Sequence, residues 1–151
     1  MSNNALSGFN NVLLKFFEQI MKWYPELSDI KLIYNATETM KKYTPRLILD
    51  QFMYFVGPYY VQIFNREESF FTNLDNIMKD PNVANAIETE DSVMQKITVF
   101  KEIFETMSDD RKKYMWKMFG ALLKVGALAS NEAEYKVILT YVEQNPGLFK
   151  E

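Results

Sequence analysis

The chain has 151 residues, of which 48% are hydrophobic and 25% are charged, so it carries enough apolar surface to fold and is not expected to be disordered. It contains no cysteine and no histidine, which excludes disulfides, thiolate metal sites, serine triads and histidine-based zinc or di-iron sites. The net charge of -3 disfavours general binding to a nucleic-acid backbone.

The beginning of the chain bears on where the protein acts. Residues 1–8 have neither the positive nor the apolar region of a signal peptide, and no apolar run reaches the ~18 residues of a membrane span. We therefore expect a soluble, cytoplasmic protein. Because no linker is long or polar enough to divide the chain, residues 1–151 should form a single helical domain.

The first expected helix has an unusually wide apolar face. Ser7 should cap it, Pro25 should follow its end, and apolar residues recur between them at helical spacing over more than half of the circumference. Such a helix is covered on several sides, either centrally within the domain or by a second subunit.

Capping residues and prolines separate the next helices. A second helix should run from Ser28 to about Lys42. A third should start at Thr44-Pro45, carry Leu49, Phe52, Met53 and Val56, and end at Gly57-Pro58. Two shorter helical stretches should follow within residues 59–64 and 70–78.

The second half is expected to be helical as well. Residues 83–107 should form one broken helix or two abutting helices. Ser108 should cap a helix that Gly126 ends, and Asn131 with Glu134 resembles a capping box for the last helix. Since strand-like alternation is absent, the sequence predicts an all-α fold, an irregular bundle of about seven short helices.

The segment 109–125 combines lysines with a large apolar side. On a wheel of about 100° per residue, Lys113, Lys117 and Lys124 share one sector, and Trp116 flanks its boundary. Such a helix can lie on an anionic membrane surface or fill a groove of a partner protein. The alternative is an ordinary packed helix whose lysines point to water. The four named residues are the candidate contact surface.

Carboxylates are the remaining candidates for catalysis or for binding a hard cation. They are grouped in two places, as Glu67 and Glu68 and as Glu88, Glu90 and Asp91. Acidic residues in turn-rich segments are usually solvated surface, and no glycine pattern forms a phosphate-binding loop. We therefore expect no cofactor, no metal and no enzymatic activity, with a carboxylate-based or metal-dependent enzyme as the alternative.

Arg46 stands out because an arginine near the start of a helix opposes the helix dipole. Its position predicts a specific carboxylate partner. Asp50, four residues further on, is the first candidate, and Glu67 or Glu68 are the others. We interpret Arg46 and Asp50 as a structural ion pair rather than a ligand site.

Spaced residues across positions 9–71 form a pattern: Phe9-Asn10, Tyr24-Pro25-Glu26, Thr44-Pro45-Arg46, Pro58-Tyr59 and Glu67-Glu68-Ser69-Phe70-Phe71. This pattern resembles a group of small uncharacterised proteins of the nucleocytoplasmic large DNA viruses. The resemblance implies a virus-encoded protein that acts in the host cytoplasm or is packaged in the virion. It implies no catalytic activity.

Together these features predict a non-enzymatic helical interaction or structural protein. Apolar positions exceed what one small bundle comfortably hides, so we expect a protein partner, a homo-oligomer or a component of a larger particle. A peripheral membrane or helix-groove binding module that uses residues 109–125 is the alternative. No nucleic acid and no small-molecule substrate is expected.

Overall fold

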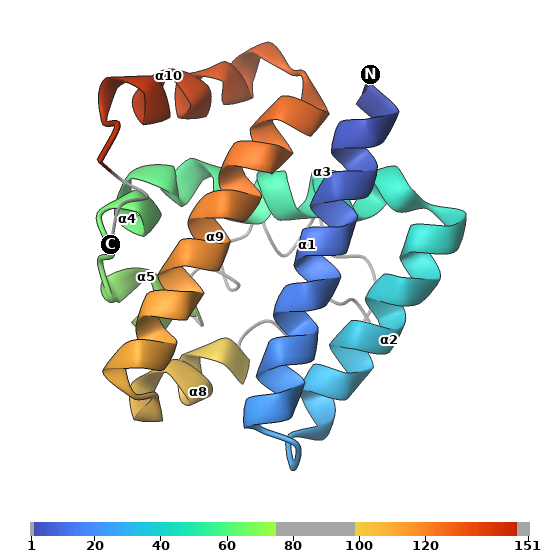
Figure 1. Ribbon diagram of the computed structural model, residues 1–151, viewed down its shortest axis with the longest axis vertical. Helices are drawn as coiled ribbons and strands as arrows, with labels where there is room; N and C mark the ends of the chain where they lie inside the picture. The colour runs from blue at the N-terminus through green and yellow to red at the C-terminus, as the bar shows by residue number, and fades with distance from the viewer. Residues whose placement is uncertain (1, 75–98, 148–151) are drawn as a thin grey trace.

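Two long helices form the front of the molecule in Figure 1. In this computed structural model, which describes residues 2–74 and 99–147, α1 (Ser2–Trp23) and α9 (Asp109–Ser130) lie side by side and run in opposite directions. On the other side of α1 lies α2 (Ser28–Tyr43), and α3 (Pro45–Val56) crosses behind. Helix α1 therefore contacts α2, α3 and α9.

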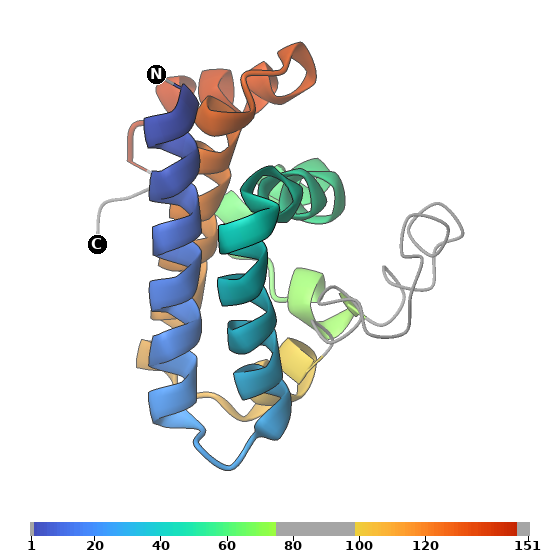
Figure 2. The same cartoon turned by 90° about the vertical axis from the view of Figure 1, so that its right-hand side faces the viewer.

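Shorter helices close the back and the upper end of the bundle. In Figure 2, α3 and α5 lie to the right of the layer that α1 and α9 form, which is the back of the molecule in Figure 1. The described residues contain helices and turns but no strand, which confirms the all-α irregular bundle. The short helices are η1 (Gly57–Tyr59), α4 (Tyr60–Phe64), α5 (Ser69–Thr72), α8 (Val99–Thr106), η3 (Ala133–Tyr135) and α10 (Lys136–Gln144).

Helix α1 starts earlier than expected, because it begins at Ser2 and Ser7 lies inside it. The prediction that Ser7 caps the helix is therefore wrong. Nothing before Ser7 breaks a helix, and Ala5 and Leu6 pack against the core, so tertiary contacts extend the helix toward the N-terminus.

The wide apolar face of α1 is covered within the single chain. Phe9, Phe16 and Ile20 are fully buried. The Phe16 ring lies 5.8 Å from the Phe100 ring and 5.6 Å from the Phe119 ring, measured between centroids. Of the two arrangements that the sequence left open, α1 therefore adopts the central one, and it needs no second subunit to cover it.

The boundaries of α2 and α3 follow the predicted signals. Helix α2 begins at Ser28 and ends at Tyr43, and Pro45 occupies the first turn of α3. Thr44 separates them without a capping hydrogen bond from its side chain, so proline geometry sets this start.

Part of the helical segments expected within 70–78 and 83–107 falls on residues 75–98, outside the described residues.

Helix α9 starts as expected, since the Ser108 side chain accepts a hydrogen bond from the Arg111 backbone N–H at 3.3 Å. Its predicted end at Gly126 is wrong. A Cβ at Gly126 would lie 2.7 Å from Met53 Sδ and 3.3 Å from Phe9 Cε1, so this glycine allows close packing of α9 on α1 and α3.

The C-terminal end of α9 is formed by Asn131. This residue adopts a left-handed conformation with φ of 55°, and its N–H bonds to Ala127 O. Asparagine tolerates that conformation better than most residues, so it ends α9 instead of capping the next helix. The expected capping box with Glu134 is therefore wrong, and the chain enters η3 directly.

Candidate functional site

The lysine sector of α9, formed by Lys113, Lys117 and Lys124, lies on the surface, and all three side chains are exposed. They stay together because residues four and seven positions apart return to the same side of a helix. Two neighbouring cations lie over aromatic rings. The Arg111 guanidinium lies over the Trp23 ring at 4.9 Å, and Lys112 Nζ lies over the Phe104 ring at 4.8 Å.

Trp116 does not belong to this surface, so its assignment to the candidate contact surface is wrong. Its side chain is buried, 5.0 Å from the Phe71 ring and 5.5 Å from the Phe104 ring. The helical wheel placed Trp116 at the boundary of the polar sector. In the fold, α5 and α8 pack on that side of α9 and bury the Trp116 side chain. Such coverage depends on neighbours that are distant in sequence.

Arg46 joins the start of α3 to the end of α9. Its Nε donates to Asp50 Oδ1 over 3.2 Å, so the partner expected from the sequence is in contact. Its Nη2 donates to Ser130 O over 2.9 Å and lies 4.0 Å from Glu132 Oε1. The negative end of the α9 dipole thus offsets the unfavourable position of Arg46 on α3. Sequence reasoning missed this second contact.

Two of the candidate carboxylates, Glu67 and Glu68, lie in the described part of the chain. Glu67 and Glu68 are exposed, and Glu68 Oε1 pairs with Lys112 Nζ at 3.4 Å. Glu88, Glu90 and Asp91 lie outside the described residues. Within residues 2–74 and 99–147, no group of three or more metal-ligating side chains comes together.

Tyr135 covers the junction of α3 with η1. A Cβ at Gly57 would lie 3.3 Å from Tyr135 Cε1, so the glycine makes room for the ring. Burial, reinforced by Glu134 and Glu132, raises the pKa of Tyr135 to about 12. The hydroxyl therefore stays protonated at neutral pH, which suits packing rather than proton transfer.

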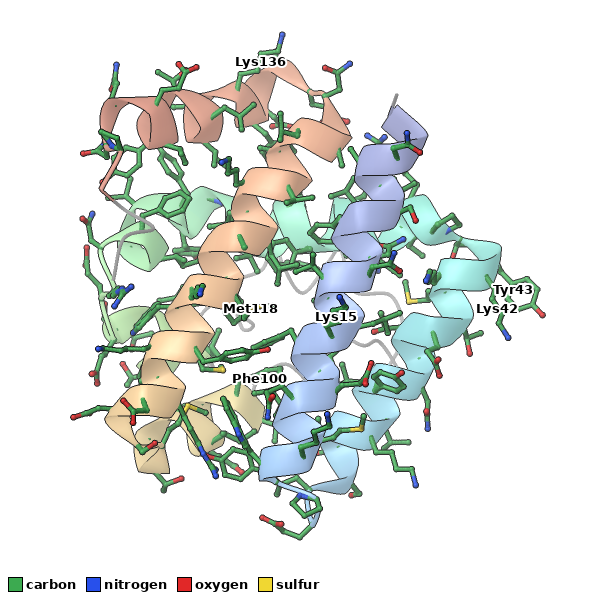
Figure 3. The ribbon with its side chains drawn as sticks, in the orientation of Figure 1. Lys15, Lys42, Tyr43, Phe100, Met118 and Lys136 are labelled. Atoms are coloured by element: carbon green, nitrogen blue, oxygen red, sulfur yellow. The ribbon has the colours of Figure 1, made fainter. Side chains whose placement is uncertain are left out.

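A partly apolar surface lies on the outer α3 face, which we define as Leu47, Asp50 and Tyr54. Leu47 is 43% exposed and Tyr54 is 47% exposed. The two are seven residues apart and so lie on the same side of the helix. Just before α3, Tyr43 is 78% exposed and points away from the body of the molecule (Figure 3). The sequence did not single out this face, because apolar residues occupy most positions of α3.

Comparison of the chain with protein-family models, curated proteins and solved structures finds no match in any of the three. None of the helices in the described part of the chain is both long and apolar enough to cross a membrane.

Proposed function

We propose that the protein is a non-enzymatic interaction protein that associates with a second copy of itself through the outer α3 face. The observation that carries this proposal is the exposure of Leu47 and Tyr54 on one side of one helix. Single exposed apolar residues are ordinary, but aligned ones offer an area that another molecule can cover.

The positions of these residues suit a two-fold pair of helices. Leu47 and Tyr54 lie on either side of Asp50, so antiparallel α3 helices would bring Leu47 of one copy against Tyr54 of the other. Asp50 would then face its symmetry mate. Because Arg46 lies 3.2 Å from Asp50 on the same helix, each acid carries its own counter-charge, which reduces the repulsion at the centre.

The absence of cysteine allows a direct test of this pairing. We would prepare Leu47→Cys and Tyr54→Cys, each with a single thiol, and mix them under mild oxidation. The expected product is the mixed disulfide of the two variants, in excess over either symmetric product. Ser7→Cys, an exposed position on α1, is the matched control and should remain monomeric. Equal cross-linking of all three variants, or none, would reject the pairing.

A second candidate is binding to an anionic membrane or an acidic partner through the lysine sector. The exposure of Lys113, Lys117 and Lys124 favours it, because clustered cations near an anionic surface act together. Replacing all three by glutamate should abolish co-sedimentation with anionic liposomes and leave the circular dichroism unchanged. Added salt should also weaken binding, since exposed charges are screened within about 10 Å. Binding that survives both changes would remove this candidate.

The biological setting that we propose, host cytoplasm or virion, is supported by the resemblance of residues 9–71 alone. The pattern includes Pro45 and Arg46, which start α3 and link it to α9, so it contains residues that shape the proposed face. Mass spectrometry of purified particles and infected cytoplasm would test the setting. Recovery in either fraction would support it, and absence from both would reject it.

A further inference from the structure

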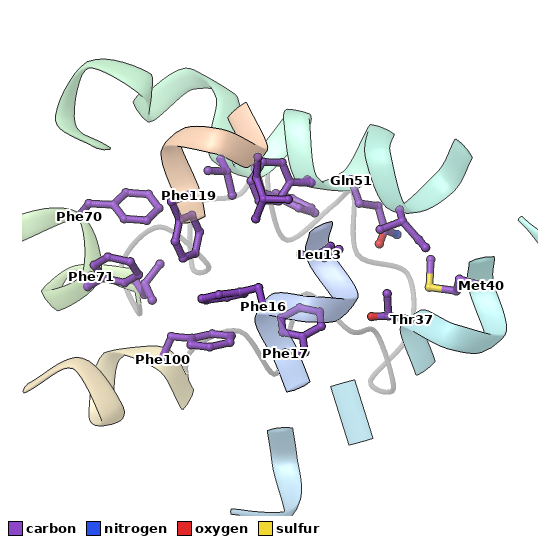
Figure 4. Close-up of a pocket in the computed structure, with 16 residues that line it drawn as sticks. Leu13, Phe16, Phe17, Thr37, Met40, Gln51, Phe70, Phe71, Phe100 and Phe119 are labelled. Carbon is purple, nitrogen blue, oxygen red and sulfur yellow. The ribbon is translucent and has the colours of Figure 1, made fainter. Parts of the chain in front are cut away.

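An apolar cavity of about 50 Å³ lies between α1, α2, α3, α5, α8 and α9. Figure 4 shows Phe71, Phe100, Phe16 and Phe119 gathered toward one end of it. The cavity is on the inner side of the helices and does not include Leu47 or Tyr54, so it is separate from the outer α3 face.

The walls make this cavity a poor site for water. A volume above about 10 to 15 Å³ can hold one water molecule, but that molecule needs two to four polar partners. Among the residues that the structure describes, none that lines the cavity is charged, and most of the lining side chains are apolar. A dry void in a close-packed interior forfeits contacts that an apolar ligand would restore.

The other end of the cavity carries two polar side chains, Thr37 and Gln51, beside Met40 (Figure 4). Thr37 Oγ1 donates to Ile33 O over 2.7 Å, and its lone pairs remain able to accept a hydrogen bond. The Gln51 side chain is partly buried, and within the described part of the chain it makes no hydrogen bond. Its amide can both donate and accept.

We propose that this cavity binds a short uncharged amphiphile, an alkyl chain that ends in a hydroxyl group. The hydroxyl would lie between Thr37 and Gln51, and the chain would extend toward Phe16 and Phe100. The described lining residues include no cation, which disfavours a charged headgroup, because burying a carboxylate without a partner is costly.

Met40 provides a reporter at the polar end. Hexan-1-ol would be titrated into the full chain carrying ¹³C-labelled methionine methyl groups, with the Met40 signal assigned through Met40→Leu. We expect a saturable shift of the Met40 methyl resonance and a rise in Tm. Hexanoate at neutral pH should bind at least tenfold more weakly, since its carboxylate meets no cation among the described lining residues.

Two adjacent buried leucines give a matched pair of variants. Leu122 lines the cavity and Leu123 does not, although both are fully buried. Leu122→Phe should fill the void and weaken hexanol binding at least tenfold, whereas Leu123→Phe should retain binding. If Leu122→Phe fails to fold, Ile48→Phe, which also enters the lining, replaces it and is judged by the same criterion.

The proposal is overturned by any of three results. The first is a Met40 shift that grows linearly with hexanol and never saturates, which indicates non-specific partitioning. The second is hexanol binding that persists in the folded cavity-filling variant. The third is hexanoate binding as tight as that of hexanol. None of these measurements depends on self-association, so this proposal and the proposed function can fail independently.

Discussion

Helices α1 and α3 are both rich in apolar residues, but they differ in how many of these residues are buried. Neighbouring helices cover the wide apolar face of α1, and its outward positions are polar, among them Asn11, Lys15 and Glu18. Helix α3 also buries one side, but it leaves Leu47 and Tyr54 partly exposed on the other. The comparison shows that an apolar excess in the sequence does not reveal which apolar side chains stay exposed.

The largest expected effect is on the free energy of unfolding, and it distinguishes the covered helix α1 from the outer α3 face. Phe16→Ala should lower the free energy of unfolding by about 3 to 5 kcal/mol, because it opens a cavity where Phe16 meets Phe100 and Phe119. Leu47→Ala should cost less than about 1 kcal/mol. Urea denaturation of both variants measures the difference, and similar costs would contradict the distinction between the two helices.

Two glycines test how closely the covered helix is packed. Gly126→Ala should destabilise the protein by about 1 to 3 kcal/mol, because the new Cβ would meet Met53 and Phe9. Gly8→Ala is the matched control within α1. Its Cβ would meet nothing within 4 Å, so the variant should be more stable by about 0.5 to 1 kcal/mol. Thermal melts should show Tm shifts of opposite sign, and shifts of the same sign would refute the packing role of Gly126.

The attachment of α3 to α9 should depend more on the backbone contact of Arg46 than on its ion pair. Arg46→Ala removes the hydrogen bond to Ser130 O and should cost about 1 kcal/mol. Asp50→Ala removes only the exposed ion pair and should cost less than about 0.5 kcal/mol. Urea denaturation of both variants at low and high salt would measure the two costs. An equal loss of unfolding free energy for the two variants would count against this ranking.

The last effect concerns alkaline pH at the end of α3, where Tyr135 packs against Gly57. The folded-state pKa of Tyr135 is about 12, above the ordinary value of 10.0. Between these values the folded state holds a proton that the unfolded state has released, so stability falls as pH rises from 10.0 toward about 12. Tyr135→Phe should lessen this fall. Stability curves of the native chain and the variant that run parallel above pH 10.0 would show that Tyr135 contributes nothing.

The sequence predicted local features better than the surroundings of side chains. Ser108 and Pro45 mark helix starts because capping and proline geometry act within one turn. Gly126 was interpreted as a stop, but its role is set by Met53 on another helix. Trp116 was placed at the surface because a helical wheel cannot show that α5 and α8 cover it. The cavity between six helices likewise exists only in the assembled fold.

The central claim is that exposed apolar residues on α3 mediate self-association, whereas the apolar face of α1 is covered within the chain. Sedimentation velocity over a range of concentrations tests it most directly, on the native protein and on the double variant Leu47→Lys, Tyr54→Lys. We predict a sedimentation coefficient that rises with concentration for the native protein and stays monomeric for the variant, with unchanged circular dichroism. A native protein that remains monomeric at high micromolar concentration, or a variant that associates equally well, would contradict the claim.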